Sequence, residues 1–263
     1  MSKEQKEYIK KHRINKLIIL GIQILIVCVF FLTWEILSKK EIINSFIFSS
    51  PSIIVNTIYE MSLGGELFKH IWVSVYETLI AFGIGLILSI GISTLLYLYN
   101  NLYRVLDPFL TCLNSLPKVA LGPIIIVWAG AGMSAIIVMA LAISLVVTIL
   151  EILNGFLNTD KELIKMAQTF NANKFQILTK IIIPANKHTF FNSLKVNIGL
   201  SLVGVITGEF LVSKAGLGYL IVYGGQVFQL DLVMTSVIIL AIVAWVMYES
   251  VVLLGKLAQR WQK

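Results

Sequence analysis

The longest polar interval between two strongly apolar blocks reads DKELIKMAQTFNANKFQILTKIIIP, from Asp160 to Pro184. Leu163, Ala167 and Phe170 recur at spacings of four and three, which places them on one face of a helix. The side chain of Asp160 can cap this helix, and two asparagines after Phe170 suit the turn that ends it. A second short helix is expected over residues 174–183, and Pro184 ends it. The stretch predicts a helix–turn–helix outside the membrane, between two spans.

Composition identifies the medium in which the chain folds. Of its 263 residues, 57% are hydrophobic and 13% are charged, about half the charged fraction of soluble domains. Apolar runs of about 20 residues recur, which is the length that crosses ~30 Å of hydrocarbon. We expect an all-α polytopic protein of the cell membrane with about six transmembrane helices, the first of which is a retained span. The net charge of +7 lies in loops and tails, where the positive-inside rule explains it without a nucleic-acid partner.

The apolar runs define the expected topology. The predicted spans cover about 17–37, 71–99, 105–128, 135–153, 190–212 and 232–254. Both termini and the loop 154–189 are basic and are therefore placed in the cytoplasm. Residues 39–70 are expected outside, with an amphipathic surface helix that begins at Ser50-Pro51. The domain organisation is then a basic N-terminal segment 1–16, one transmembrane domain 17–255 and a tail 256–263.

Two features inside the spans stand out. Proline interrupts the third span at Pro108, Pro117 and Pro123, and broken helices at membrane depth usually face protein or a cavity. The other feature is small residues at close helix contacts. Ala81, Gly85, Ser89 and Ser93 form such a stripe in the second span, and Gly204 and Gly208 are expected where two copies of the chain meet.

Chemistry of the enzymatic kind is not apparent. The sequence has no phosphate-binding loop, no catalytic pair and no metal-ligand spacing, and Cys28 and Cys112 lie in apolar runs. We therefore expect no cofactor and no catalysis, so that any ATP hydrolysis belongs to another polypeptide. Charged residues within spans are costly and often functional. Lys118, Glu209 and Glu77 are accordingly candidates for lining a translocation pathway, and for Lys118 and Glu209 a structural ion pair is the alternative.

The cytoplasmic loop resembles the signature of ABC importer permeases, in which Glu-Ala-Ala is followed by Gly and then by Ile-x-Leu-Pro. Ala167, Ile181 and Pro184 match this signature, and Ile183 replaces its leucine conservatively. Lys165-Met166 and Asn171 depart from it, although asparagine is the non-glycine residue best suited to a positive φ.

The similarity extends over residues 50–259 to the nitrate/sulfonate/taurine-type branch of these permeases. It is carried by a series of short motifs in order: Pro51-Ser52, Gly65-Glu66-Leu67, His70, Ser74, Phe82, Gly85, Asp107-Pro108, Pro117, Pro123, Trp128-Ala129-Gly130, Glu209 and Gly216-Leu217-Gly218-Tyr219. Two positions depart from the branch. Glu77 stands where arginine is usual, and Lys118 follows Pro117 where a small residue or proline is common.

The resemblance implies a type I importer built from two permease copies, two cytoplasmic ATPase subunits and an external binding protein. It would carry a small organic or inorganic solute, such as a sulfonate-, taurine- or nitrate-like anion. The residues implied in coupling to the ATPase are Leu163, Lys165, Met166, Ala167, Phe170, Asn171, Ile181 and Pro184. The expected docking face is Leu163–Ala167–Phe170, with Ala167 at its centre.

Three other functions remain open from the residues alone. An ion-gradient-driven carrier would favour inverted repeats and acidic pairs at mid-membrane. A membrane enzyme would need paired catalytic side chains near one interface. A structural scaffold would have little use for a broken third span. Co-purification with an ATPase separates the importer from all three.

Overall fold

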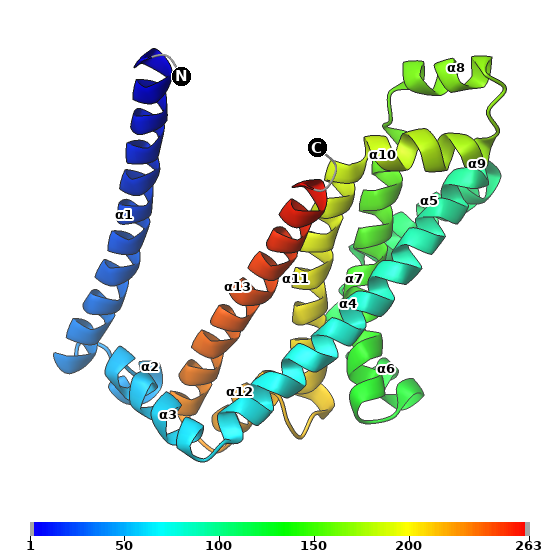
Figure 1. Ribbon diagram of the computed structural model, residues 1–263. Coiled ribbons are helices and arrows are strands. Elements are labelled where there is room, and N and C mark those ends of the chain that lie inside the picture. Colours follow the sequence, from blue (N-terminus) through cyan, green and yellow to red (C-terminus); the bar gives the residue numbers. More distant parts are fainter. Residues whose placement is uncertain (1–2, 261–263) are drawn as a thin grey trace.

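The computed structural model describes residues 3–260, and every regular element within them is a helix (Figure 1). The all-α class is therefore confirmed. In chain order the elements are α1 (Lys3–Lys39), α2 (Ser45–Phe48), α3 (Pro51–Leu63), α4 (Glu66–Leu98), α5 (Asn100–Ser115), the 3₁₀ turn η1 (Lys118–Leu121), α6 (Gly122–Ala129), α7 (Met133–Leu157), α8 (Lys161–Thr169), α9 (Lys174–Ile177), the π-helical turn η2 (Leu178–Ile182), α10 (Ile183–Ala185), α11 (Lys187–Val212), α12 (Leu217–Gln226) and α13 (Leu230–Arg260).

Five helices are long and apolar enough to cross a membrane: residues 14–39 of α1, then α4, α7, α11 and residues 230–257 of α13. A sixth crossing is available if α5 and residues 118–129 form one span, which bends by 90°. The bend confirms that this segment is broken, whereas its crossing of the membrane stays a prediction. Its cause is local, because Leu116 adopts an extended conformation before Pro117, as the residue before a proline prefers. Pro108 lies inside α5 and does not end it.

Helices α4, α7 and α11 form the centre of the bundle. The predicted stripe Ala81, Gly85, Ser89 and Ser93 is fully covered by neighbouring helices. Gly204 and Gly208 were predicted to contact a second copy of the chain, and this was wrong, since both pack on α7 of the same chain. A Cβ atom on Gly208 would lie 2.9 Å from the Cα of Ile136. The small residues of α11 therefore bring two helices of one subunit together.

The bundle has two distinct ends. In Figure 1, α8–α10 and both ends of the chain lie at one end, while α2, α3 and α12 lie at the other. A chain that crosses the membrane an even number of times has both termini on the same side, which agrees with this arrangement. The predicted cap of α3 is confirmed, because Ser50 accepts a hydrogen bond from the Ile53 backbone N–H at 3.3 Å and Pro51 follows it.

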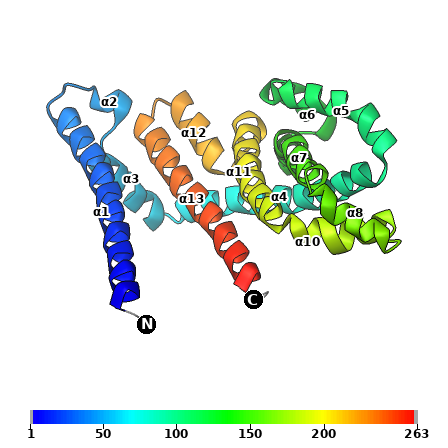
Figure 2. The ribbon, with the colours of Figure 1, turned by 90° about the horizontal axis from the view of Figure 1, so that it is seen from above.

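Helix α1 stands apart from the remaining spans, and Figures 1 and 2 show it joined to them through α2 and α3. None of the most apolar part of its span is buried within the subunit. The predicted N-terminal segment is not separate, because residues 3–16 continue the same helix as the first span. The predicted tail forms the end of α13 as far as residue 260. Residues 1–2 and 261–263 of these segments lie outside the described residues.

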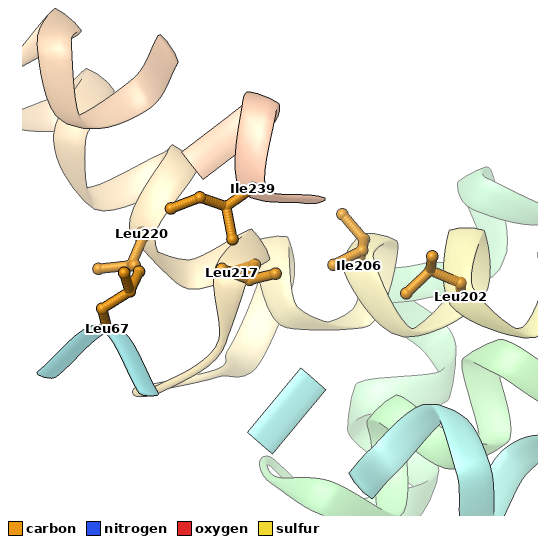
Figure 3. Packing of buried hydrophobic residues seen from close by; sticks show 6 residues of the cluster. All are labelled: Leu67, Leu202, Ile206, Leu217, Leu220 and Ile239. Atoms are coloured by element: carbon orange, nitrogen blue, oxygen red, sulfur yellow. The ribbon is translucent and has the colours of Figure 1, made fainter. Parts of the chain in front are cut away.

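The short helix α12 is held by side chains from three long helices. A buried cluster joins Leu217 and Leu220 of α12 to residues of α4, α11 and α13 (Figure 3). The contributing residues are Leu67, Leu202, Ile206 and Ile239. This packing fixes the chain that follows Glu209, and with it the backbone amides at the start of α12.

Candidate functional site

The loop between α7 and α11 has the predicted helix–turn–helix form. Asp160 caps α8 by accepting a hydrogen bond from the Glu162 backbone N–H at 2.9 Å. Asn171 has a φ of 56°, which confirms the left-handed turn residue. A capping box not predicted from the sequence starts the second helix. In it the Asn173 side chain accepts from the Gln176 N–H at 2.8 Å, and the Gln176 side chain accepts from the Asn173 N–H at 2.9 Å.

The end of the second helix was predicted wrongly. Pro184 lies in the first turn of α10 and does not terminate the helical path, which continues through Ala185. The preceding turn, η2, is π-helical. Its wider hydrogen-bonding pattern changes which carbonyl groups need a donor, so the missing N–H of proline can be accommodated. Asn186 then ties the end of the loop to its beginning, because its Nδ2 atom donates to Thr159 Oγ1 at 2.6 Å.

The packing of α8 differs from the predicted docking face. Ala167 is 6% exposed and lies in a buried cluster with Ile177, Leu178 and Ile182 of the second helix. It therefore joins α8 to the second helix and offers no free surface. Ile152 and Phe156 of α7 belong to the same cluster, so the loop is anchored rigidly to a transmembrane helix.

The exposed apolar surface of this loop is made by other residues. Leu163, Met166 and Phe170 are 39%, 52% and 81% exposed, and Phe175 in the second helix is also exposed. Phe175 was missed from the sequence, because its exposure depends on how the second helix lies against α8. Of the remaining predicted residues, Lys165, Asn171 and Pro184 are exposed and Ile181 is half-buried.

A second constellation lies near the opposite end of the bundle and holds α12. Glu209, at the end of α11, is 1% exposed. Its Oε1 atom accepts from Ser74 Oγ at 2.6 Å, and its Oε2 atom accepts from the Gly218 N–H at 2.6 Å. Ser74 Oγ in turn accepts from the Leu217 N–H at 2.8 Å. The Glu209 carboxylate thus accepts hydrogen bonds from a side chain of α4 and from the backbone at the start of α12.

The structure places Glu77 and Glu209 together and Lys118 elsewhere. Glu77 of α4 is 6% exposed and lies one turn after Ser74, whose hydroxyl donates to Glu209, so the two glutamates interact electrostatically. Lys118 Nζ donates to the Ile143 carbonyl oxygen at 3.3 Å and to Asn114 Oδ1 at 3.5 Å, at the bend between α5 and α6. Neither Lys118 nor either glutamate forms an ion pair with a described residue, so the ion-pair alternative for Lys118 and Glu209 is wrong.

His70 completes the contacts around α12 and was not predicted as a site residue. Its Nδ1 atom accepts a hydrogen bond from the Gly216 N–H at 3.0 Å, and its ring stacks on Tyr219 at a centroid distance of 5.9 Å. These contacts join the start of α4 to the start of α12. The Gly216-Leu217-Gly218 segment is the sequence signal that could have found them, because its N–H groups need partners at a helix start.

An acidic pocket of about 650 Å³ opens at the same end of the bundle. Glu60, Glu66 and Asp231 line it, and so do the stacked rings of His70, Tyr219 and Tyr223. No lysine or arginine of the described chain lines it. Its carboxyl groups and aromatic faces suit a cationic side chain or ligand group. Among the residues whose side chains the structure describes, no group of three or more His, Cys, Asp or Glu is arranged to hold a metal ion.

Comparison with known proteins agrees with this architecture. The family described as "Binding-protein-dependent transport system inner membrane component" matches residues 82–263. A Bacillus subtilis (strain 168) protein named as an aliphatic sulfonates transport permease is 30% identical over 232 residues, which cover 87% of this chain and 83% of that protein. An Escherichia coli (strain K12) protein with the same name is 27% identical over 228 residues, 87% of each chain.

Solved structures show the same fold. The MetNI methionine ABC transporter, in an inward-facing conformation, has a chain that superposes with a TM-score of 0.66 at 18% identity. The superposition covers 74% of this chain and 97% of the other. With its multiple membrane-spanning helices, the chain belongs to the binding-protein-dependent transport system inner membrane component family, the non-catalytic, multi-pass permease subunits of ABC importers in the cell membrane.

Proposed function

We propose that two copies of this chain form the translocation pathway of an importer, which two cytoplasmic ATPase subunits drive and an external binding protein supplies. The observation that carries the coupling part is the exposed apolar face Leu163–Met166–Phe170 on α8. Apolar side chains on a rigid, water-exposed helix favour a partner surface. The buried cluster around Ala167 supports transmission of force, because it connects this face to α7.

The sidedness of the subunit is part of the same proposal. The loop that contains α8 carries Lys161, Lys165, Lys174, Lys180 and Lys187, which favours the cytoplasm. The other end of the bundle is then external. The binding protein would approach that end, where the acidic pocket offers a complementary surface for basic side chains.

A matched pair of substitutions on α8 tests the coupling surface. Phe170→Glu places a charge on the exposed apolar face, and we expect it to weaken ATPase retention and uptake together. Gln168→Glu adds the same charge at an exposed polar position and is expected to change little. Both quantities are measured on the complex purified from membranes and reconstituted in liposomes. Equal retention and uptake for the two variants would contradict the coupling role of this face.

For the solute, we propose a small organic anion of the sulfonate class. Support comes from relatives named for aliphatic sulfonates in Bacillus subtilis and Escherichia coli and for taurine in Escherichia coli. Uptake of a labelled aliphatic sulfonate into liposomes should require internal ATP and external binding protein. Uptake without ATP that a protonophore abolishes would instead favour an ion-gradient carrier.

The number of permease copies has a direct test. Light scattering of the purified complex should give two permease copies for two ATPase copies, since six crossings provide half a pathway in the family that this chain resembles. A stable complex with a single permease copy would contradict the homodimer.

A further inference from the structure

Two carboxyl groups are buried near each other beside α12 without a protein cation. Glu77 and Glu209 are 6% and 1% exposed. Glu77 lies one turn after Ser74 on α4, and the Ser74 hydroxyl donates to Glu209, so the two carboxyl groups are close enough to repel each other when both are ionised. No lysine, arginine or histidine among the described residues forms an ion pair with either of them. The neighbouring helices contribute apolar side chains: Ile136 of α7 packs on Gly208, next to Glu209, and Ile239 of α13 belongs to the cluster around Leu217.

Two carboxylates cannot both remain ionised so close together in such surroundings. Burial removes the water that would solvate them, and their mutual repulsion is weakly screened. Protonation of one of the two groups removes this repulsion and supplies an O–H that the other carboxylate can accept. A positive charge must therefore come from outside the protein. A proton meets this need within the two groups, whereas a metal ion would find no third His, Cys, Asp or Glu ligand among the described residues.

The hydrogen bonds identify which carboxyl group carries the proton. Both oxygens of Glu209 already accept, one from Ser74 and the other from the Gly218 N–H. These donors favour the ionised form of Glu209. Glu77 has no comparable donors, and its Oε2 atom is buried without any partner. An unpaired oxygen is less costly on a neutral carboxylic acid than on a carboxylate. Glu77 therefore carries the proton, and Glu209 is ionised.

We propose that Glu77 and Glu209 form a proton-binding site whose occupancy holds α12 against α4 and α11. The bound proton leaves one negative charge, on Glu209, which the Ser74 hydroxyl and the Gly218 N–H stabilise. Loss of the proton places a second negative charge beside the first. The repulsion then acts on the contacts that anchor α12, since Leu217 and Gly218 are bonded through Ser74 and Glu209.

Other titratable groups near the site have defined roles. From α4, His70 faces α12 and accepts from the Gly216 N–H through Nδ1, so its ring is neutral in this structure. From α12, Tyr219 stacks on His70 and also stacks on Tyr223. From α11 the facing group is Glu209 itself. Neither Glu77 nor Glu209 forms an ion pair with any described lysine, arginine or histidine, and the charged group that acts on Glu77 is Glu209.

The position of α12 is measured by thiol labelling of the permease–ATPase complex in lipid nanodiscs. Cys28 and Cys112 are replaced by alanine, and Gln226→Cys places a thiol at the exposed end of α12. A separate protein with Ser52→Cys on α3 corrects for the pH dependence of the thiol reaction. We expect the Gln226-to-Ser52 ratio of labelling rates to rise as pH increases. In Glu77→Gln, whose amide donates to Glu209 without a titratable proton, the ratio should be constant with pH.

Two control variants separate the carboxyl pair from the titration of other side chains. His70→Asn keeps an acceptor for Gly216 without an ionisable ring and should preserve the pH dependence. Glu151→Gln, at a half-buried carboxyl group in the cytoplasmic half of α7, should preserve it too. A ratio that is constant with pH in the parent protein, or pH-dependent in Glu77→Gln, would overturn the proposal. Loss of the dependence in His70→Asn would move the switch to the imidazole and would also overturn it.

Infrared spectroscopy detects the protonated carboxyl group directly, and its first measurement uses the protein without substitutions. The parent complex should show a carboxylic-acid C=O band from a buried group, which disappears on raising the pH. The band should also be absent from Glu77→Gln and present in Glu151→Gln. Absence of such a band from the parent protein would overturn the proposal. So would a labelling ratio that depends on sodium, magnesium or calcium at fixed pH, because that result would assign the site to a metal ion.

Discussion

At the scale of single residues, α11 shows how the same residue type has different consequences at different positions. Gly204 faces the backbone of Ala140 so closely that a Cβ atom has no room. Gly199, five residues earlier on the same helix, has nothing within 4 Å of an added Cβ. A steric clash between an added Cβ atom and a backbone is difficult to relieve, because a main chain cannot rotate away as a flexible side chain can.

This contrast gives a stability prediction for α11. Gly204→Ala should destabilise the subunit by about 1–3 kcal/mol, the usual cost of overpacking. Gly199→Ala should be neutral or slightly stabilising, because alanine is the better helix former. Thermal unfolding in detergent measures both. Equal unfolding temperatures for the two variants would mean that α7 and α11 are not in backbone contact.

Lys118 provides a prediction about transport. Its ammonium group is half-buried at the bend between α5 and α6 and bonds to the Ile143 carbonyl group. If it meets an anionic solute in the pathway, Lys118→Met removes a charge-assisted contact and should raise the KM of uptake about tenfold. Lys214→Met removes an exposed lysine from the loop between α11 and α12 and serves as the control. An unchanged KM with a lowered unfolding temperature would make Lys118 structural only.

At the scale of elements, the helix–turn–helix of residues 160–185 marks how far local sequence determines structure. The Asp160 cap and the left-handed Asn171 were predictable, because both depend on groups a few residues apart. The burial of Ala167 was not, since it depends on how the second helix lies across α8. Periodicity identifies an apolar face but does not say whether another part of the chain or another protein covers it. For the same reason the partner of Gly204 was assigned incorrectly.

The position of Ala167 predicts a folding defect distinct from the effect of Phe170→Glu. Ala167→Arg buries an unpaired charge among Ile177, Leu178 and Ile182, which costs several kcal/mol. We expect α8 to detach and to be cut by protease in membranes, whereas Phe170→Glu remains resistant and affects assembly alone. Limited proteolysis followed by mass spectrometry of the loop distinguishes these outcomes. Protection of Ala167→Arg at the parent level would show that the cluster does not hold α8.

At the scale of the whole molecule, distant segments converge on one short helix. Ser74 and Glu209 are separated by 135 residues along the chain, yet a hydrogen bond joins them directly. Both also accept hydrogen bonds from backbone N–H groups at the start of α12. The sequence marks Glu77 and Glu209 as exceptional charges in spans but cannot pair them. Pairing depends on the relative rotation of α4 and α11, which the close contacts of small residues with α7 determine. Five of the crossings, by contrast, follow from apolar length alone.

The same global arrangement yields a prediction of sidedness. Ser52 on α3 and Lys161 on α8 are both exposed, and the two helices lie at opposite ends of the bundle in Figure 1. With Cys28 and Cys112 replaced, Ser52→Cys should react with a membrane-impermeant reagent on intact cells. Lys161→Cys should react only after the membrane is opened, because positively charged loops are retained in the cytoplasm.

The bent segment decides this outcome, since it crosses the membrane between the two thiols only if α5 and residues 118–129 act as one span. Helices α4 and α7 cross the membrane once each, and α5 with α6 adds a third crossing if it spans. Three crossings place Ser52 and Lys161 on opposite sides. Two crossings place them on the same side, so reaction of both thiols on intact cells would mean that the bent segment is re-entrant.

The labelled position in the loop must be exposed, as Lys161 is. The nearby Thr159 is unsuitable, because its side chain is buried and hydrogen-bonded to Asn186, where a thiol would be shielded from the reagent.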